Sequence, residues 1–375
     1  MSDINVILKP NLTDIVFISD VHFGVRNGSL EWNNNIKGYF YDFFIPHVKN
    51  IQKRGRKVAV VVAGDYFDSR QHIDINVMNT ACDVMEELTK VCSVYMIIGN
   101  HDIYKNNELD ITSLRCLKNI KNVCVIDKLT KLSIKNDINF LFVPWVGDYK
   151  KENSIITEHK DSVNFIVMHT EISGMTYDNN RPIINGVNID VCDKCVIVSG
   201  HIHKRQESKK GFYLGSPYPM DRADIGNVKG VYCISINDLG GVDINFTENT
   251  YSPRFVKVRF DETENNAFVW QTIVNNNYVD IVFTEKDMEI LNVNKFAETL
   301  YEMGAKKIEI IEEKINVVVD TDDPDVQTMN PDDITIENMF TAKVDKMDLE
   351  NDIFDDLNKL NDYYIKRAQE ELGYK

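Results

Sequence analysis

The stretch Val196-Ile197-Val198-Ser199-Gly200-His201-Ile202-His203 places two histidines at the end of an apolar run. Side chains of a strand alternate between its two faces, so His201 and His203 are expected to project the same way into one site. The pattern therefore predicts a buried strand whose carboxyl end carries metal-type ligands.

Four earlier stretches repeat this design. Apolar runs at 15–19, 58–63, 94–98 and 165–168 precede, in order, Asp20-Val21-His22, Gly64-Asp65-Tyr66-Phe67-Asp68, Gly99-Asn100-His101-Asp102 and His169. One such piece alone is more often a hydrogen-bonded polar residue than a ligand, so the inference depends on all five occurring together.

The chemistry of these side chains indicates which metals they suit. Carboxylate and amide oxygens mixed with imidazole nitrogens favour Mn, Fe or Zn, whereas a structural zinc site would favour thiolates. A carboxylate such as Asp65 can bridge two ions about 3.5–4 Å apart, and such a pair activates water for displacement at phosphorus. The sequence therefore predicts a dinuclear metal centre. The remaining histidines, His47, His72 and His159, are interpreted as surface or packing residues.

The composition of the 375 residues is that of a globular protein with more than one unit. The sequence contains no apolar run of the roughly 18 residues that a membrane span needs, and its first residues lack signal-peptide character, so we expect a cytoplasmic protein. Seven scattered cysteines favour free thiols in a reducing compartment. Cys192 and Cys195 form a C-x-x-C, interpreted as packing in preference to a redox or zinc site.

The net charge of −16 argues against binding nucleic acid by bulk charge alone. Residues 320–375, however, contain 16 acidic and 6 basic side chains, so −10 of this charge lies there. The acidic total therefore says little about the predicted active face.

The chain divides into four predicted parts. Residues 1–252 alternate strands and helices, with helices expected at 39–51 and 77–91. Residues 253–319 read as a small α+β domain, with strands at 254–260, 278–283 and 307–319 and a helix at 294–303. An acidic, proline-broken linker at 320–333 precedes a helical tail at 334–375. The tail's apolar stripe needs a partner surface, either on its own chain or, as we favour, on another protein.

The five pieces, in the order D-x-H, G-D-x-x-D, G-N-H-D, H, G-H-x-H, resemble the calcineurin-like metallophosphoesterases. The additional domain and tail resemble the nuclease subunits of ATPase–nuclease repair complexes of the SbcCD and T-even phage type. Further details of that branch are Pro144-Trp145, the stretch 169–174, and Leu214-Gly215-Ser216-Pro217. This resemblance implies an α/β fold: a β-sandwich flanked by helices, a small α+β cap domain and a C-terminal helical ATPase-binding tail.

The resemblance also implies roles for individual residues. One metal would be held by Asp20, His22 and His203, the other by Asn100, His169 and His201, with Asp65 as a catalytic bridge. His101 would contact the scissile phosphate and help to protonate the leaving oxygen, and Asp68 would have a supporting role. Mn is the expected metal of both sites, with Fe, Zn or Mg as alternatives.

The function implied by the resemblance is a Mn-dependent DNA exonuclease and endonuclease that hydrolyses phosphodiester bonds. It would act as a homodimer with an SMC-like ATPase of the SbcC type, bound through the C-terminal helices, in DNA recombination, repair or replication. The expected compartment is the cytoplasm of a bacterium or of a phage-infected host. Two alternatives stay open: a phosphatase or phosphodiesterase acting on non-DNA substrates, and a non-catalytic DNA-binding scaffold for the ATPase.

Overall fold

The computed structural model describes residues 4–105, 109–237, 239–263 and 266–313. The predicted linker and helical tail lie outside these residues, and the proposed division of the chain at residues 252 and 319 stays a prediction. No helix within the described ranges is long and apolar enough to cross a membrane.

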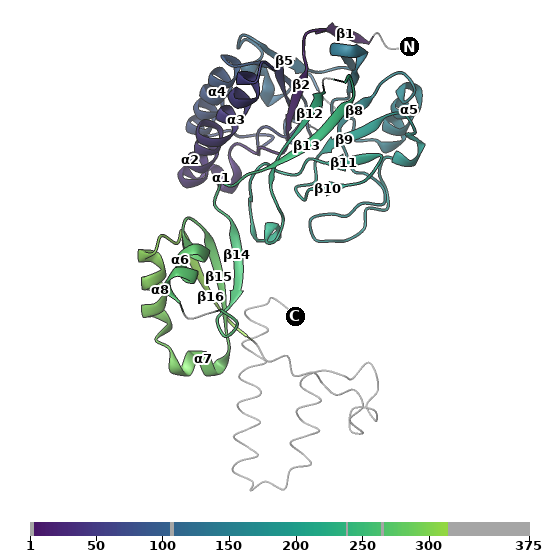
Figure 1. Ribbon diagram of the computed structural model, residues 1–375. Coiled ribbons are helices and arrows are strands. Elements are labelled where there is room, and N and C mark those ends of the chain that lie inside the picture. The colour runs from purple at the N-terminus through teal and green to yellow at the C-terminus, as the bar shows by residue number, and fades with distance from the viewer. Residues whose placement is uncertain (1–3, 106–108, 238, 264–265, 314–375) are drawn as a thin grey trace, which may run out of the picture. The chain divides into compact units, whose positions relative to one another are not determined.

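Two mixed sheets pack face to face (Figure 1). The six-stranded sheet has the order β13 (Val242–Glu248), β12 (Gly230–Ile236), β2 (Asp14–Ile18), β3 (Val58–Ala63), β4 (Ser93–Ile97) and β5 (Val123–Ile126). The seven-stranded sheet has the order β1 (Asn5–Leu8), β6 (Thr130–Ser133), β7 (Asn139–Phe142), β8 (Phe165–His169), β9 (Val196–Gly200), β11 (Gly211–Tyr213) and β10 (Gln206–Glu207). Strands β2 to β5 are parallel, as are β7, β8, β9 and β11.

The core between the sheets follows from strand alternation. Phe17 and Val61 of one sheet pack with Phe140, Val167 and Val198 of the other in one buried cluster. Residues at the alternate positions face outward, and because helices cover that side they are apolar too, which explains the continuous apolar runs in the sequence. The expected sandwich architecture is therefore present.

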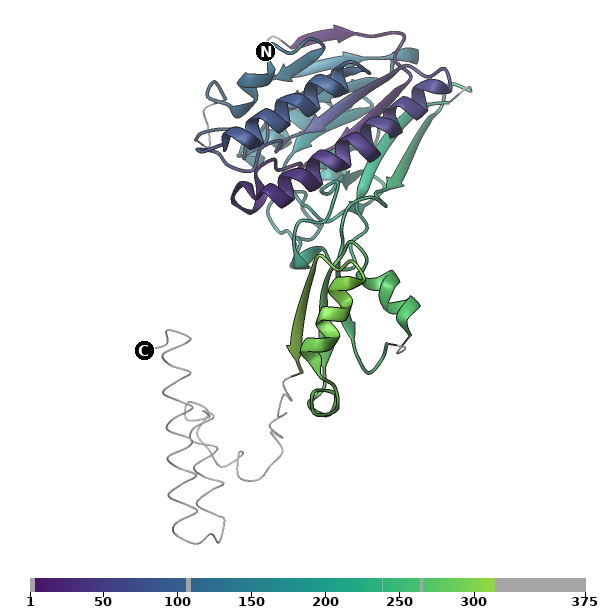
Figure 2. The same ribbon diagram turned by 90° about the vertical axis from the view of Figure 1, so that its left-hand side faces the viewer.

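Helices cover the outer face of the six-stranded sheet (Figure 2). They are α2 (Leu30–Gly38), α3 (Ile45–Lys53) and α4 (Ile75–Thr89), preceded by the short α1 (Val25–Gly28). The segment η1 (Tyr39–Phe44), a π-helix, joins α2 to α3, so the helix expected at 39–51 is part of a longer one. On the seven-stranded sheet, Ile156 of α5 (Tyr149–His159) packs with Ile166 and Ile197. Short 3₁₀ segments are η2 (Ser113–Leu117), η3 (Lys135–Asp137), η4 (Ile189–Val191) and η5 (Arg222–Asp224).

A third, parallel sheet forms the small unit, which we define as residues 255–312. Its strand order is β14 (Phe255–Arg259), β15 (Tyr278–Phe283) and β16 (Lys307–Glu312), with helices α6 (Ala267–Val274), α7 (Glu285–Ile290) and α8 (Val293–Glu302). Its own core contains Trp270, Ile281 and Leu300. Trp32 of α2 stacks on Phe255 and Tyr278, with ring centroids 6.2 and 5.8 Å away.

Candidate metal centre

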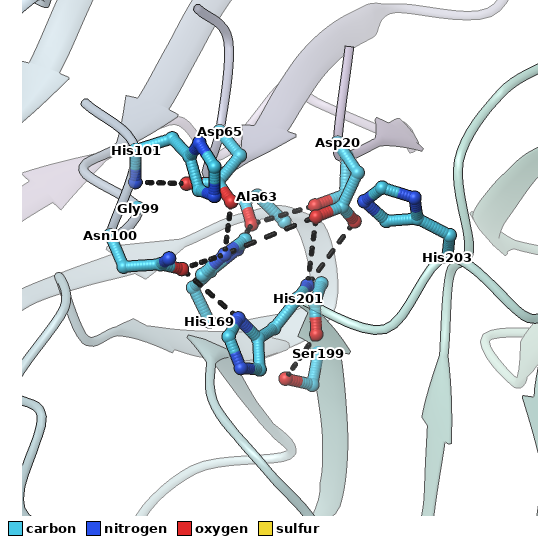
Figure 3. A network of polar contacts seen from close by, with 12 residues as sticks. Asp20, Ala63, Asp65, Gly99, Asn100, His101, His169, Ser199, His201 and His203 are labelled. Atoms are coloured by element: carbon cyan, nitrogen blue, oxygen red, sulfur yellow. Dashed lines mark hydrogen bonds and ion pairs between the residues drawn. The ribbon is translucent and has the colours of Figure 1, made fainter. Parts of the chain in front are cut away.

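The five sequence pieces meet at one edge of the two sheets. Strands β2, β3 and β4 are parallel, so the loops that follow them leave the sheet at the same end, and β8 and β9 of the facing sheet end beside them. Figure 3 shows the resulting side chains turned toward one another. Three groups of histidine and carboxylate side chains lie close enough together to hold a cation, and the third, which contains His22, Asp68 and His101, shares His22 with the first.

The first group contains Asp20, His22 and His203, all within ligand distance of one another. The Nε2 atoms of His22 and His203 lie 3.1 Å apart. On the other side of the His22 ring, Nδ1 lies 3.1 Å from a carboxylate oxygen of Asp68. A carboxylate beside the remote nitrogen of a histidine can orient the ring.

The second group contains Asp65, His169 and His201, and Asn100 lies among them. Nδ1 of His169 donates to the carbonyl of Ala63 at 2.8 Å, which leaves Nε2 without a proton in the neutral ring. That Nε2 nevertheless faces two oxygens, Oδ1 of Asn100 and Oδ2 of Asp65, both at 3.0 Å. Nδ1 of His201 lies 3.0 Å from the same Asn100 oxygen.

This convergence of lone pairs is a test of whether the residues fit a metal. Nε2 of His169, Oδ1 of Asn100 and Oδ2 of Asp65 can all act as hydrogen-bond acceptors, and both oxygens lie 3.0 Å from the His169 nitrogen. Either a proton on that nitrogen or a cation must therefore lie between them. The mixed nitrogen and oxygen donors, without a thiolate, match Mn, Fe or Zn. The donor set therefore fits divalent ions.

Asp65 belongs to the second group and also lies near the first. Its Oδ2 lies 3.0 Å from Nε2 of His169 and 3.9 Å from Nε2 of His22. Its Oδ1 accepts a hydrogen bond of 2.8 Å from the backbone N–H of His101, which fixes the orientation of the carboxylate. Asp65 thus directs one oxygen at both groups. Asp20 of the first group also approaches the second, with its Oδ1 3.9 Å from Nε2 of His169.

The electrostatics of the site are dominated by these close pairs. Burial alone would raise the pKa of Asp65, but the charges of His169 and His22 hold it well below its usual range. Burial alone would lower the pKa of His169, but the carboxylates of Asp65 and Asp20 raise it. The pKa of His22 is also raised, against burial, by Asp68 and Asp65. Protons and divalent ions would therefore compete for the same nitrogens.

The backbone corrects one sequence-based argument. Strand β9 ends at Gly200, and His201 has a left-handed φ of 86°, so strand alternation does not direct His201 and His203. The two side chains join different groups. Left-handed φ values also occur at Asp20 (53°), His22 (49°) and Asp65 (50°). Such conformations are costly for residues other than glycine and cluster at functional sites.

Gly99 permits the close approach of two of these loops. A Cβ atom at this position would lie 2.2 Å from Oδ1 of Asp65 and 2.4 Å from its backbone nitrogen. Both distances are far shorter than van der Waals contact, so a larger residue would displace Asp65 or the loop.

Three buried or half-buried carboxylates support the site without entering it. Asp102 accepts hydrogen bonds from the backbone N–H groups of Tyr66, Phe67 and Gly99, and burial together with the Asp65 charge raises its pKa to about 7. Asp102 is the last residue of the G-N-H-D piece, and its sequence context predicts no role for it. Glu152 accepts from Thr170 at 2.7 Å, and Glu171 lies 3.8 Å from Nε2 of His201. Glu171 lies in the quoted stretch 169–174 but was given no role, and no motif marked Glu152.

His101 differs from its neighbour Asn100 in where it points. Its Nδ1 donates to the Asp68 carbonyl at 2.5 Å, and its ring packs edge-on against His22 with centroids 4.9 Å apart. The ring thus borders the first group, while the Asn100 oxygen lies in the second. Cys192 and Cys195 are free, buried thiols of one hydrophobic cluster, and neither belongs to these groups.

Comparison with known proteins defines the class. Residues 13–205, more than half of the chain, match the family described as calcineurin-like phosphoesterase. The chain belongs to this family, and its buried histidine and aspartate groups are consistent with the dinuclear metal site typical of it.

Three relatives show similarity over about half of the chain. "Putative phosphoesterase 244L" of Invertebrate iridescent virus 6 is 31% identical over 54% of this chain and 69% of its own length. "Putative phosphoesterase 078R" of Invertebrate iridescent virus 3 is 26% identical over 55% and 57%. "Exonuclease subunit 1" of Enterobacteria phage T4 is 28% identical over 58% and 63%. This chain thus spans between about half and two thirds of these relatives.

Proposed function

We propose that this protein is a Mn²⁺-dependent DNA nuclease that hydrolyses phosphodiester bonds in recombination, repair or replication. The observation that carries the proposal is the convergence of acceptor atoms around Asp65 in two adjacent groups. The resemblance to the phage exonuclease subunit favours DNA over other phosphate esters.

In this proposal Asp20, His22 and His203 hold one ion, and Asn100, His169 and His201 hold the other. Asp65 is shared between them, as its two short approaches to His169 and His22 support. When bound, two such ions supply an activated water and stabilise the charge that develops on the phosphoryl oxygens. The protein's contribution is to fix the seven side chains before substrate arrives.

His101 is proposed to act on the leaving group. Its Nδ1 is committed to the Asp68 carbonyl, so Nε2 carries a proton only when the ring is the imidazolium. In that state Nε2 can donate to the scissile phosphate and then transfer its proton to the departing 3′ oxygen. The neutral ring that remains keeps its Nδ1 hydrogen bond and regains a proton from water.

A partner is also proposed. The relative from phage T4 is named as a subunit, and the sequence of residues 334–375 has an apolar stripe ringed by aspartates. We propose that this tail binds an SMC-like ATPase at an apolar groove bordered by basic residues, and that the nuclease works as a homodimer.

The test offers linear duplex DNA, bis(p-nitrophenyl) phosphate and p-nitrophenyl phosphate to the purified protein with Mn²⁺. Asp65→Asn purified in parallel controls for contaminating nucleases. We expect DNA cleavage by the wild type that the variant lacks. Cleavage of the small esters but not of DNA would instead indicate the phosphatase or phosphodiesterase alternative. DNA binding without any hydrolysis would indicate the scaffold.

A further inference from the structure

Lys229 is a buried cation next to the first metal-type group. It precedes strand β12, and only 4% of its surface is exposed. Its Nζ donates to the backbone carbonyl of His203 at 2.6 Å and forms an ion pair with the carboxylate of Asp224. A buried ammonium is tolerated only with such partners, so the three groups hold one another in a fixed geometry.

Asp224 is itself fixed by the short segment η5. Its other carboxylate oxygen accepts a hydrogen bond of 2.8 Å from the backbone N–H of Met220. Two residues earlier in η5, Arg222 extends to the small unit. Its guanidinium donates to both carboxylate oxygens of Asp280 in β15, at 2.6 and 2.9 Å, and also contacts Glu309 of β16.

Arg222 is exposed, as the polar surroundings of this residue in the sequence predict, with 45% of its side chain accessible to solvent, yet its guanidinium is paired with carboxylates. Asp280 is 5% exposed, so its carboxylate depends on the bidentate pair with Arg222. Paired side chains and the η5 turn thus link the small unit to the backbone of His203.

We propose that Lys229 is a positioning residue for His203, and that Arg222 couples this position to the small unit. The Lys229 hydrogen bond fixes the backbone carbonyl of His203. Because Nε2 of His203 faces His22, this bond also fixes the position of that nitrogen. The small unit, through Asp280 and Arg222, then sets the divalent-ion affinity of one group of ligands. The inference deepens the proposed function and rests on its assignment of His203 to an ion.

Loss of the Lys229 hydrogen bond need not unfold this region. The His203 carbonyl also accepts from the backbone N–H of Ser216 at 3.1 Å, so one donor is retained. Lys229→Met keeps the apolar stem and removes the ammonium. The expected result is a shift of His203 within its group.

The experiment titrates Mn²⁺ into the metal-free full chain by calorimetry and follows the bound ions by electron paramagnetic resonance. In Lys229→Met we expect one of two ions to bind about 10- to 100-fold more weakly, as for other outer-shell partners, with the second ion unchanged. Lys229→Arg should restore most of the affinity. The matched control is Lys210→Met, which removes a lysine that pairs with exposed Asp193.

The coupling is tested with Arg222→Met and Asp280→Asn. Each should weaken the same ion by about 2- to 30-fold in the wild-type background. Neither should have a further effect in the Lys229→Met background, because the link to His203 is already broken. If Lys229→Met does not fold, the Mn²⁺ affinities of Arg222→Met and Asp280→Asn test the proposal in its place.

Equal Mn²⁺ affinities in Lys229→Met and wild type would overturn the positioning role, and so would equal weakening of both ions. Additive effects of Arg222→Met and Lys229→Met would overturn the coupling. None of these measurements requires DNA. A protein that shows the selective Mn²⁺ shift but cleaves no DNA would therefore retract the proposed function and keep this inference.

Discussion

His101 and Asn100 are adjacent in sequence but have different partners, and this difference separates binding from catalysis. The Asn100 oxygen faces His169 and His201, whereas the His101 ring is hydrogen-bonded to the Asp68 carbonyl. In His101→Gln we therefore expect both Mn²⁺ ions to bind normally and hydrolysis to fall by about 10²- to 10⁴-fold. Metal content by mass spectrometry, measured beside the rate, checks this. Loss of both ions with the activity would make His101 a ligand or a structural support.

Asp65 is the residue whose loss should affect both groups at once. Asp65→Asn keeps the shape and the hydrogen bond to the His101 N–H but removes the charge that lies between His169 and His22. We expect hydrolysis to be abolished and the affinity for both ions to fall, while far-ultraviolet circular dichroism stays unchanged. Near wild-type cleavage of bis(p-nitrophenyl) phosphate by Asp65→Asn with Mn²⁺ would contradict the two-metal assignment.

At the residue scale, the sequence predicted which side chains gather but not how they are held. Five apolar runs that end in aspartate, asparagine or histidine were enough to predict that Asp20, Asp65 and His201 lie close together. Their left-handed backbone could not be anticipated, because φ at a loop residue depends on the loops that pack around it. Lys229 and Asp224 carried no signal either, since they meet His203 through its backbone carbonyl.

Among the structural elements, the loops that follow β3 and β4 are the most tightly fitted. A methyl group at Gly99 would overlap the Asp65 side chain and backbone. We expect Gly99→Ala to lower the free energy of unfolding by about 1–3 kcal/mol, measured by urea denaturation. Gly241→Ala is the matched control, because its Cβ would meet only the side chain of half-buried Asn237 at 3.0 Å. Equal stability of the two variants would mean that the β4 loop relaxes freely.

Strands that are buried on both faces were predicted more successfully than short strands with polar positions. Strand β3 was expected at 58–63 and lies there, because a run of valine and alanine covered on both faces has a strong signal. The short strands β6 and β7 were not predicted. Each has four residues with polar positions, and their pairing is set by tertiary contacts. The π-helical segment η1 inside the long helix was likewise invisible to a 3.6-residue period.

At the scale of the whole molecule, the described residues contain five hydrophobic clusters and the three candidate metal groups. A chain ending at Val319 should therefore fold, bind two Mn²⁺ ions and keep Mn²⁺-dependent cleavage of bis(p-nitrophenyl) phosphate. Thermal unfolding and Mn²⁺ calorimetry of the truncated chain check this.

The same truncation should remove binding to the SMC-like ATPase. The sequence of the tail places Leu349, Ile353, Leu357 and Leu360 at helical spacing. Burying four such side chains supplies roughly 6–12 kcal/mol before the costs of association. Co-purification of the ATPase with full-length and truncated chains measures the loss, and Leu357→Asp in the full chain is the point-variant control expected to behave like the truncation. A truncated chain that binds the ATPase as tightly as the full chain, or that does not fold, would mean that these leucines pack on their own chain.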